Sequence, residues 1–68
     1  MKVLVAKRKT ENKLRYYNGK CFVIGKNRAV DISIMNTEET INKFIEALYK
    51  YLETTPEAGT IDYYTMDI

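Results

Sequence analysis

The chain has 68 residues, of which 46% are apolar and 29% charged, a mixture typical of one small globular domain rather than a disordered segment. It has no histidine and one cysteine, Cys21, which argues against an internal disulfide, a structural zinc site and a histidine-dependent catalytic triad. The net charge of +2 is unevenly spread: residues 1–29 hold nine lysines and arginines against one acid, giving +8, and residues 30–68 hold two against eight, giving −6.

The sequence also carries signals about cellular compartment. No run approaches the ~20 consecutive apolar residues of a membrane span, and the apolar residues 3–6 are too few for a signal peptide. A secreted domain of this size usually carries several disulfides, whereas this chain has a single cysteine. We therefore expect a cytoplasmic protein with no membrane span, no bound metal and no cofactor.

A strand is predicted over residues 2–8, because the apolar run inside it is rich in β-branched residues and is flanked by lysines. A hairpin follows, with strands over residues 13–17 and 20–24. The two strands are separated by Asn18 and Gly19, a pair that supplies the two positive-φ residues of a type I′ turn. This turn would place Tyr17 directly opposite the first residue of the second strand.

The predicted register divides the side chains of the hairpin between two faces. We expect one face to pack into the core, and it carries Leu14, Tyr16, Cys21 and Val23. The other face is mixed basic and aromatic, and we expect it to face solvent because its burial would bury three cations. It carries Lys13, Arg15, Tyr17, Lys20, Phe22 and Ile24.

A fourth strand and a helix are predicted next. Over residues 29–35, apolar residues alternate with other residues, as in a half-buried strand. Residues 36–54 predict an amphipathic helix that Asn36 or Thr37 caps and that ends before Pro56. Its apolar stripe, which we expect to pack on the sheet, consists of Ile41, Phe44, Ile45, Leu48 and Leu52.

The last segment, residues 57–68, contains three acids and no lysine or arginine, and it favours either a short strand near 60–66 or an acidic tail. The predicted fold class is therefore α+β: a small antiparallel meander of about four strands packed on one α-helix, in the order β-β-β-β-α, with or without a short C-terminal strand. Within a single domain, 1–68, the basic sheet would occupy residues 1–35 and the helix 36–54.

The spacing of residues predicts no catalytic site, so we expect a binding domain rather than an enzyme. Lysines and arginines neutralise phosphates, and aromatic rings stack on bases, so the basic half of the chain is typical of a nucleic-acid surface. The first expectation is a basic sheet face that binds nucleic acid or another polyanion. Its residues would be Lys7, Arg8, Lys9, Lys13, Arg15, Tyr17, Lys20, Phe22, Lys26 and Arg28.

The same charge asymmetry also favours an alternative, in which the domain is a regulator or inhibitor that binds an acidic protein surface. Because its two halves carry opposite charge, it could equally form a homo-oligomer. The candidate protein-binding residues are Tyr63, Tyr64 and Met66, since a strand near 60–66 could extend the sheet of a partner.

The sequence resembles two classes of known protein, one in its composition and one in its predicted layout. The short length and the composition, rich in Lys, Asn, Ile and Tyr, are typical of small phage and mobile-element proteins, many of which inhibit a host protein. The predicted layout resembles the small DNA-reading domains at the N-termini of some tyrosine recombinases, in which a three-stranded sheet rests on one C-terminal helix. The second resemblance concerns architecture alone and implies no functional residues.

Overall fold

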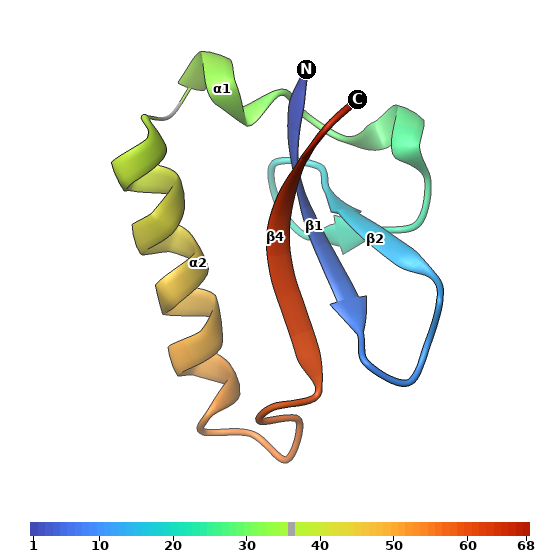
Figure 1. Ribbon diagram of the computed structural model, residues 1–68, viewed down its shortest axis with the longest axis vertical. Coiled ribbons are helices and arrows are strands. Elements are labelled where there is room, and N and C mark those ends of the chain that lie inside the picture. Colours follow the sequence, from blue (N-terminus) through green and yellow to red (C-terminus); the bar gives the residue numbers. More distant parts are fainter. Residues whose placement is uncertain (36) are drawn as a thin grey trace.

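A computed structural model describes residues 1–35 and 37–68 (Figure 1). The described chain forms a four-stranded antiparallel sheet in the order β3-β2-β1-β4, with a long helix against one face, which confirms the predicted α+β class. In chain order the elements are β1 (Lys2–Arg8), β2 (Leu14–Tyr17), β3 (Phe22–Val23), the 3-10 helix η1 (Lys26–Arg28), α1 (Ile32–Met35), α2 (Glu38–Leu52) and β4 (Ile61–Asp67).

The first strand, β1, lies in the centre of the sheet, with β2 on one side and β4 on the other. Side chains alternate between the two faces of a strand, yet Val3, Leu4, Val5 and Ala6 are all buried. Both faces of β1 are therefore covered in the middle of the strand. This explains why its sequence is a continuous apolar run instead of an alternation of apolar and polar residues.

The C-terminal segment forms β4, an edge strand that pairs with β1 from Lys2 opposite Asp67 to Arg8 opposite Ile61. Of the two outcomes expected for residues 57–68, the structure has the strand. In Figure 1, β4 runs alongside β1 and brings the two chain ends together. The backbone N–H of Ile68 donates to the carbonyl of Met1 at 2.8 Å.

The strand predicted over residues 29–35 is wrong, because this segment holds the short helix α1. Asp31 explains the difference: its carboxylate accepts hydrogen bonds from the N–H of Ser33 at 3.0 Å and from its hydroxyl at 2.6 Å. Such local side-chain bonds start a helical turn and compete with strand pairing. The alternating apolar residues also do not share one buried face, as they would in the predicted strand: Ile32 is buried, whereas Ile34 is 80% exposed.

We expect Asp31 to make the stability of the domain depend on pH. The hydroxyl of Ser33 is the main cause that lowers the pKa of this carboxyl, and the backbone N–H groups of Ser33 and Lys2 act in the same direction against partial burial. A carboxyl whose pKa is lower in the folded chain stabilises the fold above its unfolded pKa of about 3.9. That stabilisation is lost as the pH falls through the folded pKa.

We expect Asp31→Asn to lower the melting temperature at pH 7 and to flatten its decline below about pH 5, because the variant has no carboxylate to protonate. Circular dichroism melts across this pH range measure both effects. Glu46→Gln, on the exposed surface of α2, is the control and should retain the acid profile of the wild type. An Asp31→Asn profile that parallels the wild type would refute the role of this carboxylate.

The predicted hairpin forms, but its turn lies one residue further along the chain. Phe22 pairs with Tyr17, where the prediction placed Lys20. The side-chain oxygen of Asn18 accepts the N–H groups of Lys20 and Cys21, both at 2.9 Å, and so caps the turn. In the described chain only glycines have positive φ, so the predicted type I′ turn is not made. Cys21 is exposed in the turn instead of buried in the core.

The prediction also chose the wrong face of the hairpin as the core face. Tyr17 and Phe22 point toward α2, with their ring centroids 5.5 Å apart, and the Tyr17 ring lies edge-on to Phe44 at 5.4 Å. By the pairing register, Leu14, Tyr16 and Val23 lie on the opposite face.

The argument from buried cations fails because few cations lie within the paired strands. Lys13 and Lys20 lie outside β2 and β3, so Arg15 is the one cation of these two strands that shares the face of the two rings. Its side chain remains 31% exposed. Burial of the aromatic pair under α2 therefore leaves no unpaired charge in the core.

The core lies between β1 and the two α-helices. Leu4, Ile32 and Ile41 form its buried centre, and half-buried Tyr17, Phe22, Val30, Ile45 and Leu48 pack around them. Thr37 caps α2 as predicted, since its hydroxyl accepts the N–H of Thr40 at 3.3 Å. The other predicted cap, Asn36, lies outside the described residues.

A tyrosine of α2 is hydrogen-bonded to the backbone of β4. The Tyr49 hydroxyl accepts the N–H of Tyr63 at 2.9 Å and donates to the Tyr63 carbonyl at 3.3 Å, and the two rings meet edge-on at 5.3 Å. The backbone groups of Tyr63 point away from β1, because the alternate residues of β4 carry the hydrogen bonds to β1. The helix is therefore joined to the sheet by polar bonds as well as by packing.

Candidate binding surfaces

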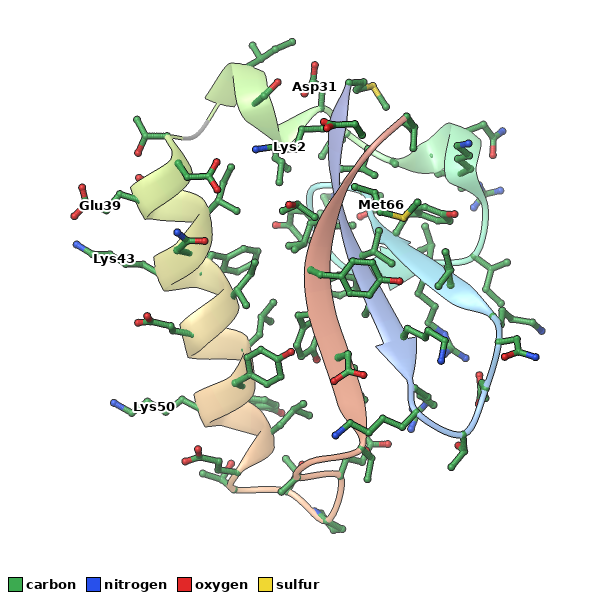
Figure 2. All side chains as sticks on the ribbon, in the orientation of Figure 1. Lys2, Asp31, Glu39, Lys43, Lys50 and Met66 are labelled. Atoms are coloured by element: carbon green, nitrogen blue, oxygen red, sulfur yellow. The ribbon has the colours of Figure 1, made fainter. Side chains whose placement is uncertain are left out.

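One face of the sheet points away from both α-helices and carries aliphatic and tyrosine side chains. The register places Tyr16, Val5 and Tyr64 in one row across β2, β1 and β4. Figure 2 shows Met66 on the side of β4 away from α2. We call this surface the open sheet face, and it consists of Leu14, Tyr16, Val23, Tyr64 and Met66 around the buried Val3 and Val5.

Charged residues border the open sheet face at one end. Lys7 lies opposite Asp62 on one side and Leu14 on the other. The Tyr64 side of the face is the more accessible, with this residue 36% exposed. Of the three residues predicted to bind a protein, Tyr64 and Met66 lie on this face, whereas Tyr63 points toward α2.

The ten residues predicted to bind nucleic acid do not lie on one surface. Tyr17 and Phe22 pack against the core beneath α2, so their rings do not form an outward stacking platform. Arg8, Lys9 and Arg15 lie near carboxylates. Their closest nitrogen–oxygen distances are 2.8 Å from Arg8 to Glu57, 4.0 Å from Lys9 to Asp62, and 3.4 Å from Arg15 to Glu11.

The folded chain brings its basic and acidic halves together. Lys2 of β1 pairs with Glu38 of α2 at 3.0 Å. Arg8 joins β1 to Glu57 in the loop before β4, and Lys9, which follows β1, approaches Asp62 of β4. The charge asymmetry of the sequence is thus partly cancelled in three dimensions. Five of the predicted cations have no carboxylate within 4 Å among the residues that the structure describes: Lys7, Lys13, Lys20, Lys26 and Arg28.

The outer surface of α2 is polar and highly exposed. In Figure 2, Glu39, Lys43 and Lys50 point away from the sheet. The Glu39–Lys43 pair, 3.4 Å apart, has side chains that are 79% and 73% exposed, so it contributes little to stability. This surface has the character of a solvated helix face.

Three of the predicted residues do meet, on the α2 side of the sheet. A cavity of about 170 Å³ is lined by side chains from all four strands. We call it the arginine pocket, and it is formed by Ala6, Arg8, Arg15, Phe22, Ile61 and Tyr63. Sequence reasoning singled out Arg8, Arg15 and Phe22 for nucleic acid and Tyr63 for a partner protein, but it named neither Ala6 nor Ile61 as a site residue. Ile61 and Tyr63 reach the pocket because β4 pairs with β1.

Comparison of the chain with protein-family models, with curated proteins and with solved structures found no match. None of the helices that the structure describes has the length and apolar character needed to cross a bilayer. Within residues 1–35 and 37–68, no three histidine, cysteine, aspartate or glutamate side chains are grouped as metal ligands would be.

Proposed function

We propose that this protein is a non-catalytic binding domain whose open sheet face binds the surface of a partner protein. The proposal rests on Tyr16 and Tyr64, which flank the buried Val5 on a face that neither α1 nor α2 covers. Tyrosine and methionine are enriched in protein interfaces, where tyrosine offers a large contact area and loses little conformational entropy. Such a domain would act as a regulator or inhibitor of its partner.

The charge around this face favours an acidic partner surface. Lys7 borders the face beside Asp62, and the five cations that have no carboxylate within 4 Å among the described residues lie in or next to the β1–β2–β3 part of the chain. Complementary charge accelerates association and selects against basic partners. The exposed, unpaired Cys21 suits a reducing compartment, so we place the interaction in the cytoplasm.

Nucleic acid is the second candidate ligand, and the same five cations are the observation that favours it. With Tyr17 and Phe22 packed under α2, this candidate depends on phosphate contacts without base stacking by these rings. Its affinity should therefore fall steeply with added salt. The protein candidate instead depends on apolar contacts that salt affects much less.

The test compares capture of a partner by the tagged wild type, by Tyr64→Glu and by the control Tyr51→Glu, from a lysate of the cells that encode the chain. Tyr51 is 67% exposed on α2, away from the open sheet face. We expect Tyr64→Glu to weaken capture of the identified protein about tenfold or more, since it puts a charge into an apolar interface. We expect Tyr51→Glu to bind like the wild type.

Two further measurements decide between the candidates. Circular dichroism must show that Tyr64→Glu remains folded, and nuclease treatment of the lysate should leave capture intact. Capture that nuclease abolishes, together with binding of labelled DNA or RNA at ~50 mM salt, would favour the nucleic-acid candidate. Equal capture by the wild type and a folded Tyr64→Glu would refute the open sheet face as the binding surface.

A further inference from the structure

We propose that the arginine pocket binds a small organic acid in which a carboxylate or phosphate group is attached to an aromatic ring. The pocket lies on the α2 side of the sheet, so it is separate from the open sheet face, and the inference does not depend on the proposed function. Its walls divide into a cationic side and an apolar side, which are the two features that such a ligand would need.

The cationic side comes from two guanidinium groups on neighbouring strands. Arg15 of β2 pairs in register with Ala6 of β1, and Arg8 follows two residues later on the same face of β1. Because Ala6 has only a methyl group, a hollow remains in the sheet between the two longer side chains. Guanidinium groups bind carboxylates and phosphates through paired N–H donors, so this hollow is bordered by two groups that can bind an anion.

The side chain of Glu11 shows where an acid would sit. One carboxylate oxygen lies 3.4 Å from Nη1 of Arg15 and the other 3.9 Å from Nε of Arg8. Both distances exceed the ~2.7–2.9 Å of a strong charge-assisted hydrogen bond. Glu11 lies in the loop between β1 and β2 and is 40% exposed, so a ligand acid could displace it without disturbing a strand.

A second carboxylate holds one of the two arginines in place. Nη1 of Arg8 lies 2.8 Å from Glu57, in the loop before β4, which fixes its guanidinium at the border of the pocket. The Nε edge of Arg8, which faces Glu11, would then serve the ligand together with Arg15. The site therefore combines one anchored cation with one that is loosely paired.

The apolar side is formed by Phe22 and Tyr63, whose ring centroids lie 5.5 Å apart with planes inclined at 50°, together with Ile61. The Tyr63 hydroxyl adds no negative charge, because a tyrosine with its ordinary pKa of about 10 is protonated at neutral pH and burial, the main cause, raises this pKa further. An aromatic ring in the ligand could pack against this wall while its acid group replaces Glu11.

The size of the cavity limits the ligand to a small one. A volume of about 170 Å³ lies below the ~300–1,000 Å³ of sites that hold drug-sized molecules. One ring with one acid group suits this volume, whereas a complete nucleotide does not. Phenyl phosphate and benzoate are therefore suitable probes, with inorganic phosphate and benzyl alcohol as the matched compounds that lack the ring or the charge.

The experiment is an NMR titration of the ¹⁵N-labelled chain with each of the four compounds. We expect phenyl phosphate and benzoate to cause saturable shifts at Ala6, Arg15, Phe22 and Tyr63, and the two control compounds to bind about tenfold more weakly or not at all. No saturable shift with either aromatic acid would overturn the proposal. Inorganic phosphate that binds as tightly as phenyl phosphate would overturn it as well, because the aromatic wall would then have no role.

Variants test whether the two arginines bind the ligand or serve only as structural ion-pair partners of Glu11. Arg15→Gln should weaken phenyl phosphate about tenfold, whereas Glu11→Gln should tighten it several-fold because the internal competitor loses its charge. Arg28→Gln, in η1, is the control and should have no effect. If Arg15→Gln fails to fold, Glu11→Gln alone decides, and unchanged affinity in that variant would contradict the proposal. Partner capture through Tyr64 should be unchanged in Glu11→Gln, so the two proposals fail independently.

Discussion

Leu4→Ala is expected to lower the free energy of unfolding by about 2–5 kcal/mol, a large share of the ~5–15 kcal/mol typical of a whole domain. Leu4 is 1% exposed on the central strand and packs against Ile32 and Ile41. It also lines a cavity of about 250 Å³ under α2, together with Tyr17 and Phe44. Truncation would enlarge a space that the surrounding side chains already leave unfilled.

Urea unfolding followed by circular dichroism measures this loss. Ile34→Ala is the matched control, because Ile34 is 80% exposed on α1 and its truncation should change stability by less than about 0.5 kcal/mol. Phe44 makes a weaker test than the amphipathic pattern of α2 predicted, since it is 38% exposed. A Leu4→Ala variant with the wild-type midpoint would show that the core is not centred on β1.

Deletion of residues 60–68 is expected to abolish folding of the remaining chain. The deletion removes β4, which pairs with β1 along the whole length of that strand. Val3, Leu4 and Val5, now almost inaccessible to solvent, would lie on an unpaired edge with one side uncovered. Tyr49 would also lose both of its hydrogen bonds to Tyr63.

Circular dichroism and the dispersion of the NMR spectrum test this outcome, with deletion of Ile68 alone as the control that should stay folded. A truncated chain that keeps its helical signal and melts cooperatively would contradict the prediction. From the sequence alone, loss of the segment could equally have left a folded chain with altered binding. Because β4 belongs to the core sheet, the binding role of its residues is better tested by a point change such as Tyr64→Glu.

The elements that the sequence predicted correctly are those whose signals are local. The β-branched run of β1 and the apolar stripe and Thr37 cap of α2 depend on residues close together in the chain. The strand expected over residues 29–35 failed because Asp31 forms local hydrogen bonds that apolar periodicity does not register. The prediction of the core face of the hairpin was wrong for the opposite reason: this face is set by the packing of α2 on Tyr17, a tertiary contact that a local pattern does not show.

For the candidate sites too, the sequence indicated residue types but not the tertiary contacts that bring them together. Composition pointed to Arg8, Arg15 and Phe22, and the structure gathers these three around one pocket. Composition could not place Ile61 and Tyr63 beside them, because that depends on the pairing of the two ends of the chain. The open sheet face was only partly predicted: Tyr64 and Met66 were expected to bind a protein, whereas Leu14, Tyr16 and Val23 were assigned to the core because the position of α2 was not known.

The hydroxyl of Tyr49 has a consequence for the behaviour of the protein at high concentration. An edge strand presents unused backbone donors and acceptors, and these are the groups through which sheets of separate molecules join into aggregates and fibrils. Midway along the outer side of β4, Tyr49 occupies both the N–H and the carbonyl of Tyr63. A foreign strand that docked there would have to break both bonds, so this one side chain opposes growth of the sheet beyond its fourth strand.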